Sequence, residues 1–287
     1  MATDAPFGTI NLKEYYYSEL GWGHSYQSDI IFDFLMQASQ HVGTGVILDA
    51  GAGHQRYKPF FADATYVAQE HPIAGKSNKN IIEYDILSDV KKIPLADNCL
   101  DAILSTSSLE HIEFPAQFFR ESFRVLKPGG ALFINVPFVY HEHEIPFDFQ
   151  RPTRYGLHGY YSRAGFEEIT VDPSSSSTYA GNYFYHYSAN EDAKVFFENY
   201  YFKNILRKLF LLPSRIVGTL TAKLLDRGPH GSTTFPVGWV AAGYKPGFHS
   251  PNNTTYTVDE FVCKYAVLDD NHILENSRIV SKLKYEE

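Results

Sequence analysis

The segment that most constrains the fold is a short apolar run at residues 46–48, which leads directly into Asp49, Gly51 and Gly53. A continuous apolar run is typical of a strand that is buried on both faces of a parallel sheet. The two glycines allow the backbone to turn sharply and to approach a ligand, and a helix that starts there presents free N–H groups. The segment therefore predicts a nucleotide-binding turn at the carboxyl edge of an α/β sheet.

The rest of the chain alternates between strand-like and helix-like patterns. Strands are predicted at residues 66–68, 81–84, 100–104, 131–136, 166–171 and 237–244. Helices are predicted at residues 11–41, 115–126, 153–164 and 191–226. We expect Pro213 to interrupt the last helix, and the serine-rich residues 173–178 to form a loop. This alternation predicts an α/β protein.

Composition restricts the class of protein. With 44% hydrophobic and 20% charged residues, the chain of 287 residues can bury a sizeable core. Its net charge of −8 argues against a surface that grips nucleic acid. The two cysteines, Cys99 and Cys263, form neither a disulfide framework nor a zinc motif, so a reducing compartment fits best. The first residues do not resemble a secretory signal, and no apolar run approaches the roughly 18 residues that cross a bilayer, so we expect a cytoplasmic protein, at most membrane-peripheral.

The residues around the glycine turn indicate which nucleotide would bind. Arg56 stands where a dinucleotide fingerprint needs a third glycine, and the chain has no GxxxxGK[ST] loop, so a dinucleotide and a triphosphate both lose support. Glu70 ends the second predicted strand, where a carboxylate can accept both ribose hydroxyl protons. Asp85 follows the third predicted strand and can accept the adenine amino group, while Ile86 offers an apolar face to the ring. This pattern favours a ligand with adenosine at one end and an amino acid at the other.

Four segments in order then resemble the class I S-adenosylmethionine-dependent methyltransferases. They are residues 46–53, 93–104, the LEHI stretch at 109–112 and the RVLKPGG stretch at 124–130. The resemblance covers residues 44–172. It implies a Rossmann-like, seven-stranded, mostly parallel sheet with helices on both faces and S-adenosylmethionine bound across the carboxyl edge.

Residues at matching positions acquire expected roles from this resemblance. The methionine end would be shaped by Asp49, Gly51 and Gly53, and its amine or sulfonium would be faced by Ser105 and Thr106. The ribose would be bound by Glu70, and the adenine by Asp85 and Ile86. The expected domains are an N-terminal helical segment (1–43), the methyltransferase core (44–172), a helical insertion or lid (173–234), the final core strand (235–246) and a C-terminal extension (247–287).

Candidate acceptor residues follow the fifth strand. His141 and His143 alternate with two glutamates, so in an extended chain the two histidines share one face. Either can act as a general base, or can instead be a loop histidine bonded to the backbone. The pair with Asp148 could start a metal site, but no third ligand can be identified, so the sequence predicts no metal. The residues expected to bind the acceptor are Asp148, Arg151, Arg154 and Tyr155, with ion pairing as the alternative for an arginine.

The acceptor class follows from a second resemblance. Residues 143–166 are similar to a segment of methyltransferases associated with surface-polysaccharide and other glycan pathways. This favours O-methylation of a sugar, a glycan or another small molecule. The alternatives are an N- or C-methyltransferase of a small metabolite and a non-catalytic binding subunit with the same fold.

Residues 203–227 combine a basic face with an apolar stripe. Six of the residues are basic and one is acidic, while apolar residues recur at spacings of three or four. Such a helical pair can lie on an anionic membrane, or it can form a lid whose stripe packs on the domain. In the tail, residues 261–268 are expected to add an edge strand or to cover a partner chain, which leaves a homodimer open.

Overall fold

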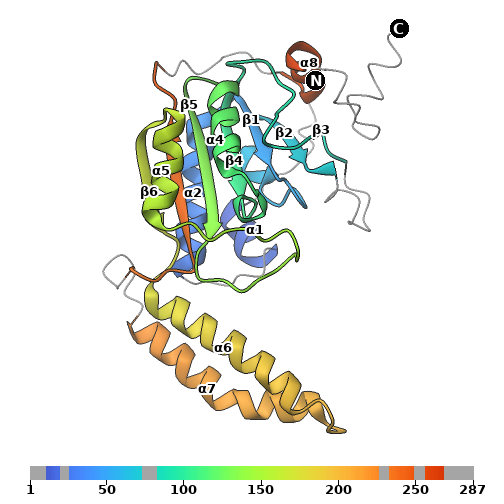
Figure 1. Ribbon diagram of the computed structural model, residues 1–287, viewed down its shortest axis with the longest axis vertical. Helices are drawn as coiled ribbons and strands as arrows, with labels where there is room; N and C mark the ends of the chain where they lie inside the picture. Colours follow the sequence, from blue (N-terminus) through green and yellow to red (C-terminus); the bar gives the residue numbers. More distant parts are fainter. Residues whose placement is uncertain (1–10, 20–25, 73–82, 226–232, 249–255, 268–287) are drawn as a thin grey trace.

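The computed structural model describes residues 11–19, 26–72, 83–225, 233–248 and 256–267 (Figure 1). Its centre is a seven-stranded sheet in the order β3-β2-β1-β4-β5-β7-β6. The strands are β1 (Val46–Ala50), β2 (Thr65–Glu70), β3 (Ile86–Leu87), β4 (Leu100–Thr106), β5 (Leu126–Pro137), β6 (Glu167–Pro173) and β7 (Gly238–Tyr244). Neighbouring strands are parallel from β3 to β5, whereas β7 is antiparallel to both β5 and β6. The predicted seven-stranded, mostly parallel sheet is confirmed.

Helices cover both faces of this sheet. The described helices are α1 (Leu12–Glu19), α2 (Tyr26–Val42), α4 (Pro115–Val125), α5 (Arg154–Ala164), α6 (Ser177–Phe196), α7 (Lys203–Leu225) and α8 (Val258–Tyr265), with the short 3-10 helices η1 (Lys58–Phe61) and η2 (Leu109–His111). Successive β1 side chains point to opposite faces. Leu48 belongs to the buried cluster that includes Phe118 of α4 and Tyr161 of α5, whereas Ile47 belongs to the cluster that includes Leu35 of α2.

The parallel strands place three loops at one edge of the sheet. Since β1, β4 and β5 run in the same direction, the glycine turn after β1, η2 after β4 and the loop after β5 all start at the carboxyl edge. The α6–α7 hairpin also projects from this end of the molecule (Figure 1). The topology thus gathers the candidate residues of the sequence.

The third strand differs from its prediction. Residues 81 and 82 lie outside the described part of the chain, Glu83 and Tyr84 are not in a strand, and pairing with β2 starts at Ile86. Asp85 therefore precedes β3 instead of following it. Its backbone N–H donates to the carbonyl oxygen of Ala68 at 2.9 Å, and its carboxylate accepts the Ala68 N–H at 2.8 Å. These bonds tie Asp85 to β2, and regular strand pairing begins at the next residue, Ile86.

The predicted helical insertion also differs in detail. The predicted loop at residues 173–178 is wrong at its ends, because Pro173 ends β6 and α6 begins at Ser177, where the Ser176 hydroxyl caps the Tyr179 N–H at 3.1 Å. The expected interruption at Pro213 is also wrong, since α7 continues through it. Proline removes only its own N–H bond, and the remaining bonds of a long helix keep the segment helical. The break in the pair lies instead between Phe196 and Lys203.

The C-terminal residues that are described form a helix instead of the edge strand considered above. Thr257 and Glu260 make a capping box at the start of α8. Phe261 and Val262 are buried in the same cluster as α4. Only an isolated bridge between Leu95 and Ala266 extends the strand-type pairing here, within the described residues. The amphipathic spacing of the segment thus suits a helix that packs on the core.

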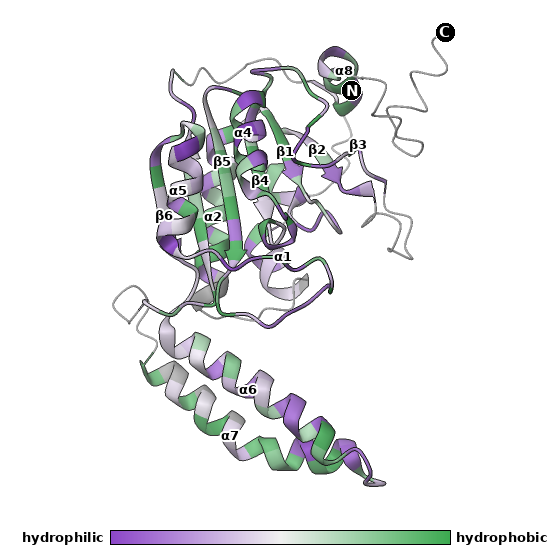
Figure 2. Ribbon diagram, in the orientation of Figure 1, coloured by the Kyte–Doolittle hydropathy of each residue, from purple (hydrophilic) through white to green (hydrophobic). Residues whose placement is uncertain are grey.

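Two further observations concern membranes. Among the helices that the structure describes, none is both long and apolar enough to span a bilayer. Large apolar side chains are nevertheless exposed along α7. Figure 2 shows that hydrophobic residues are frequent in this helix.

Candidate functional site

The glycine turn after β1 is held against the end of β2. Gly51 and Gly53 both have positive φ, +79° and +49°. The Gly51 N–H donates to the backbone oxygen and to the side-chain Oε1 of Gln69, both at 3.1 Å. A Cβ on Gly51 would lie 2.2 Å from Ser108 Oγ, whereas a Cβ on Gly53 would have no heavy atom within 4 Å. The turn is therefore packed on one side and open at Gly53.

Glu70 lies directly beside this open turn. Its Oε2 accepts the Gly53 N–H at 2.8 Å, and its Oε1 accepts the N–H of His71 at 2.8 Å. The Tyr84 hydroxyl donates to the Gly53 carbonyl oxygen at 3.0 Å from the other side of the turn. Each carboxylate oxygen can accept further bonds, so Glu70 remains able to accept two hydroxyl donors. Tyr84 was not singled out from the sequence, because a lone tyrosine before a strand carries no local signal.

Asp49 comes directly before the glycine turn. Its side chain is buried inside β1, where the Tyr66 hydroxyl donates to Oδ2 and Oδ1 has no hydrogen-bond partner. Burial raises the pKa of Asp49 to about 7, the Tyr66 bond partly offsets this, and the charge of Glu70 adds to it. Asp49 thus lies beneath the turn and shapes it from within.

The other expected cofactor residues differ in burial and in hydrogen bonding. Ile86, the first residue of β3, is fully buried in the core cluster, and its contact with the adenine ring stays a prediction. Ser105 is also buried, and its Oγ has no hydrogen-bond partner. Thr106 is half-buried at the end of β4, where its side chain bonds to Tyr57. Asp85 holds the edge of β2 through the bonds described above.

The loop after β5 folds over η2. Gln150 Nε2 donates to the carbonyl oxygens of Leu109 at 2.9 Å and Ile112 at 3.2 Å, and the Phe149 N–H donates to the Glu110 carbonyl oxygen at 2.8 Å. The backbone oxygen of Phe147 lies 2.6 Å from His111 Nδ1. These bonds bring the acceptor-side loop onto the segment that follows β4.

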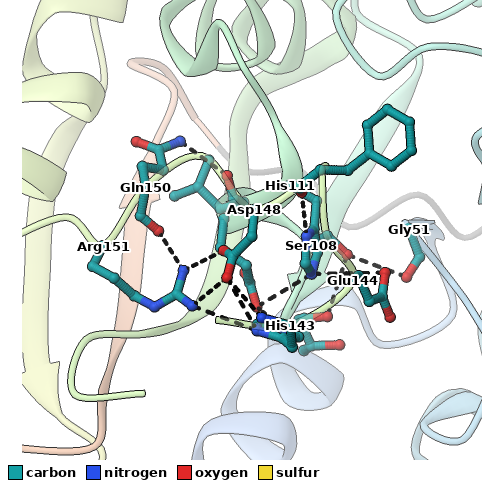
Figure 3. A network of polar contacts seen from close by, with 12 residues as sticks. Gly51, Ser108, His111, His143, Glu144, Asp148, Gln150 and Arg151 are labelled. Carbon is teal, nitrogen blue, oxygen red and sulfur yellow. Dashed lines mark hydrogen bonds and ion pairs between the residues drawn. The ribbon is translucent and has the colours of Figure 1, made fainter. Parts of the chain in front are cut away.

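The result is a polar network centred on Glu110, His111 and His143 (Figure 3). Glu110 Oε1 lies 3.8 Å from His111 Nε2 and 3.7 Å from His143 Nε2. The potential ligand atoms of the three residues all lie within 4.8 Å of one another. Burial raises the pKa of Glu110 to about 7, although its backbone N–H and His111 oppose this shift. Glu110 and His111 belong to the LEHI stretch, but the sequence alone assigns them no role.

Asp148 and Arg151 form a bidentate pair next to His143. Arg151 Nη1 and Nη2 lie 2.5 Å and 2.7 Å from the two carboxylate oxygens of Asp148, and these bonds lower the Asp148 pKa to about 2. Asp148 Oδ2 also accepts the His143 N–H at 3.0 Å. Ion pairing, the alternative to acceptor binding, therefore applies to Arg151.

His141 lies on the same side of the loop as His143. The two histidines are half-buried and the intervening Glu142 is exposed, as the alternation predicted. The His141 ring stacks on Tyr187 of α6, with 3.9 Å between centroids, and on Tyr140, with 4.3 Å. Burial, followed by His143 and Arg151, lowers the pKa of His141. Its Nδ1 is buried and has no hydrogen-bond partner.

The last two predicted acceptor residues, Arg154 and Tyr155, lie at the start of α5 and have different surroundings. The Arg154 guanidinium lies over the Trp239 ring, 5.1 Å from its centroid, and its Nε is buried without a partner. Tyr155 is 84% exposed. The structure thus brings His141, His143 and the Asp148–Arg151 pair together, and leaves Tyr155 outside this group.

The residues of the glycine turn are suited to bind the expected adenosyl ligand. Gly53 opens to free space, Glu70 stands beside it with acceptor capacity to spare, and the buried Asp49 Oδ1 and Ser105 Oγ lie at the ends of β1 and β4 without partners. A ligand with ribose hydroxyls and an ammonium group matches this donor and acceptor set. Ile86 and Asp85 are the residues that do not clearly fit.

Comparisons with known proteins find similarity to methyltransferases. Residues 48–134 match the family described as "Methyltransferase domain". A ubiquinone biosynthesis O-methyltransferase of Mus musculus is 30% identical over 73 residues, 25% of this chain and 20% of the relative. A probable S-adenosylmethionine-dependent methyltransferase of Mycolicibacterium smegmatis is 27% identical over 119 residues, 42% of this chain and 37% of the relative. The chain thus spans well under half the length of these curated relatives.

Among solved structures, similarity is found to phosphoethanolamine N-methyltransferase 2 of Haemonchus contortus in complex with S-adenosyl-L-methionine. The TM-score is 0.46 and the identity 15%, over 76% of this chain and 52% of that structure.

Proposed function

From the match of residues 48–134 to a methyltransferase domain, we propose that the chain is a class I S-adenosylmethionine-dependent methyltransferase that methylates an oxygen of a sugar, glycan or other small-molecule acceptor. The observation that carries the proposal is the open turn at Gly53 with the Glu70 carboxylate bonded to its N–H at 2.8 Å. When bound, S-adenosylmethionine supplies an activated methyl group on a positively charged sulfur.

Residues of the turn would hold the cofactor. Glu70 accepts bonds from the ribose hydroxyls, and the backbone at Gly51 and Gly53 lets the methionine end approach closely. Thr106, half-buried at the end of β4, is the residue available to the methionine amine. Asp85 keeps β2 and the segment before β3 together at the adenine end.

On the acceptor side, His141 is the proposed general base. The stacked rings of Tyr140 and Tyr187 hold the imidazole in one orientation, and because Nδ1 is buried, Nε2 is the ring nitrogen that would take the proton. A base held in this way takes the proton from an acceptor hydroxyl without first reorganising. Since Tyr187 lies on α6, the hairpin takes part in positioning His141.

Two observations support an oxygen as the acceptor atom. The segment 143–166 resembles methyltransferases of glycan pathways, and the similar protein of Mus musculus is named an O-methyltransferase. A hydroxyl also needs a base for deprotonation, which His141 provides. Neither observation selects a particular sugar or metabolite.

The hairpin extends the proposal to a membrane surface. Ile205, Leu209 and Leu220 of α7 are each more than half exposed. Lys203 and Lys208 lie on the same helix, in a chain whose net charge is −8. Exposed apolar side chains that alternate with basic ones favour anionic lipid over neutral lipid, so an acceptor dissolved in or attached to such a membrane is favoured.

Calorimetry with S-adenosylhomocysteine tests the cofactor site. We expect Glu70→Ala to weaken binding by about 10- to 100-fold, because charge-assisted bonds to two hydroxyls are worth about 1.5–3 kcal/mol. Glu113→Ala, on an exposed glutamate, is the matched control and should bind like the wild type. A wild type that binds no S-adenosylhomocysteine would favour the non-catalytic binding subunit.

Vesicle co-sedimentation tests the membrane contact. The protein should sediment with phosphatidylglycerol vesicles but not with phosphatidylcholine vesicles, and Leu209→Ser with Leu220→Ser should abolish this. Tyr155→Ser, which removes an exposed aromatic ring outside the hairpin, should have no effect. If the wild type fails to sediment and instead forms a dimer that the leucine variants dissociate, the apolar face binds a second copy and the membrane contact is refuted.

A further inference from the structure

Glu110 is a buried carboxylate without a hydrogen-bond partner. The residue is 0% exposed, and neither Oε1 nor Oε2 has a hydrogen-bonding group within reach in the described part of the chain. The Nε2 atoms of His111 and His143 lie 3.8 and 3.7 Å from Oε1, too far for hydrogen bonds. A buried carboxylate without a partner is costly, so a positively charged occupant would stabilise its charged form.

The two histidines are oriented as metal ligands. His111 Nδ1 lies 2.6 Å from the Phe147 carbonyl oxygen, and His143 Nδ1 lies 3.2 Å from the His141 carbonyl oxygen and 3.4 Å from Asp148 Oδ2. At His111 this oxygen favours the tautomer in which Nδ1 carries the proton. At His143 the two oxygens favour the same tautomer, although the donor Arg151 Nη2 also lies 3.4 Å from Nδ1. Each Nε2 then turns a free lone pair toward Glu110. An outer oxygen that orients the imidazole in this way is the usual support of a metal-bound histidine.

We propose that Glu110, His111 and His143 bind a divalent transition-metal ion. Bonds of about 2.1 Å require ligand atoms about 3–3.6 Å apart, so the observed separations of 3.7 to 4.8 Å need to shrink by about 0.1–1.8 Å. Two imidazoles and one carboxylate suit Zn²⁺, Co²⁺, Mn²⁺ or Fe²⁺ better than Mg²⁺ or Ca²⁺, which prefer oxygen ligands. Two of the three ligands thus come from η2, and His143 becomes a metal ligand in place of the base expected from the pattern.

The position of this site suggests a role in catalysis. This role rests on the proposed function, whereas metal binding itself does not. Ser108, immediately before η2, touches the glycine turn: its hydroxyl lies 3.4 Å from the Gly51 carbonyl oxygen. The metal site therefore lies between the cofactor turn and the acceptor-side loop (Figure 3). Three protein ligands leave positions open, and Glu144, with Oε2 at 3.9 Å from His111 Nε2, is exposed on that side. An acceptor hydroxyl that occupies an open position would be oriented and would lose its proton more readily, to His141 or to solvent.

Titration of the chelator-treated full chain with Co²⁺ tests the site, read by the visible absorbance of the bound ion and by calorimetry. We expect Glu110→Gln and His143→Ala to weaken binding by at least about 100-fold, since loss of a direct ligand exceeds the 10- to 100-fold effect of outer-shell changes. His158→Ala, on an exposed histidine of α5, is the matched control and should bind like the wild type. Zn²⁺ should displace Co²⁺, and Mg²⁺ should not.

Circular dichroism and S-adenosylhomocysteine binding on the same samples separate the possible failures. Folded variants that keep the nucleoside affinity but lose Co²⁺ support the metal site. A wild type that binds the nucleoside but no Co²⁺, or variants that bind Co²⁺ as the wild type does, would overturn it and leave the methyltransferase proposal intact. Co²⁺ bound through these residues without nucleoside binding supports the metal site and refutes the proposed function. If Glu110→Gln does not fold, His143→Ala, which changes a half-exposed side chain, decides.

Discussion

Gly51→Ala tests whether the packed side of the turn is as tight as the structure indicates. The substitution has two costs. A non-glycine residue in the left-handed region, where Gly51 has φ +79°, costs about 1–2 kcal/mol. The new Cβ would also meet Ser108 Oγ at 2.2 Å and Ser108 Cβ at 2.8 Å, and overpacking of this kind costs about 1–3 kcal/mol. We therefore expect the free energy of unfolding to fall by about 2–5 kcal/mol.

Two further variants separate these costs. Gly53→Ala has a positive φ of +49° but no atom within 4 Å of the new Cβ, so it should lose only about 1–2 kcal/mol. In a double-mutant cycle, Ser108→Gly should restore about 1–3 kcal/mol to Gly51→Ala and leave the backbone cost. Urea unfolding followed by circular dichroism measures each value, with the slope expected to stay constant. If Gly51→Ala loses less than about 0.5 kcal/mol, or Ser108→Gly restores nothing, the reasoning is refuted.

Three further predictions concern buried polar groups. Burial raises the pKa of Asp49 from 3.8 to about 7, so the folded state holds a proton that the unfolded state releases, and the free energy of unfolding falls as pH rises from about 4 to 8. Asp49→Asn should lack this fall and should gain about 1–3 kcal/mol relative to the wild type across this pH range. Urea unfolding at a series of pH values measures the difference. Lys127 Nζ lies 2.7 Å from the buried Asp101 Oδ2, so Lys127→Met should cost about 3–5 kcal/mol, and adding Asp101→Asn should recover part of it; equal stability of the single and double variants would contradict this. The Tyr161 hydroxyl donates to the Leu132 carbonyl oxygen at 3.0 Å, so Tyr161→Phe should lower the midpoint of thermal unfolding by an amount equivalent to about 1 kcal/mol, whereas an unchanged midpoint would mean that the bond contributes nothing.

The main elements of the fold could be predicted because their signals are local. The helix at 115–126 and its stop at KPGG correspond to α4 and the start of β5, and Thr153 and Gly165 bound α5 as N-cap and left-handed C-cap. Capping residues and glycines act on the backbone within a few positions, so the chain encodes them in order. The predicted helix break at Pro213 and the edge strand considered for residues 261–268 are wrong because tertiary packing outweighs the local preference. The helix α7 packs against α6, and Phe261 packs into the core.

The candidate site likewise contains residues that local sequence signals predict and residues that they do not. The glycine turn and Glu70 follow from strand ends, because parallel strands place their carboxyl ends at one edge of the sheet. Ile86 follows the strand predicted at residues 81–84, whereas regular pairing with β2 begins at Ile86 itself, which packs in the core.

By itself, the sequence determined the α/β alternation, the sharp turn at Gly51 and Gly53 and the position of Glu70 at the end of β2, since these depend on hydrophobic periodicity and on backbone freedom at single residues. Only the tertiary structure decided that Glu110 and His111 meet His143. That meeting depends on the loop after β5 folding back onto η2 through Phe149 and Gln150, and hydrogen bonds between segments so far apart leave no periodic trace along the chain.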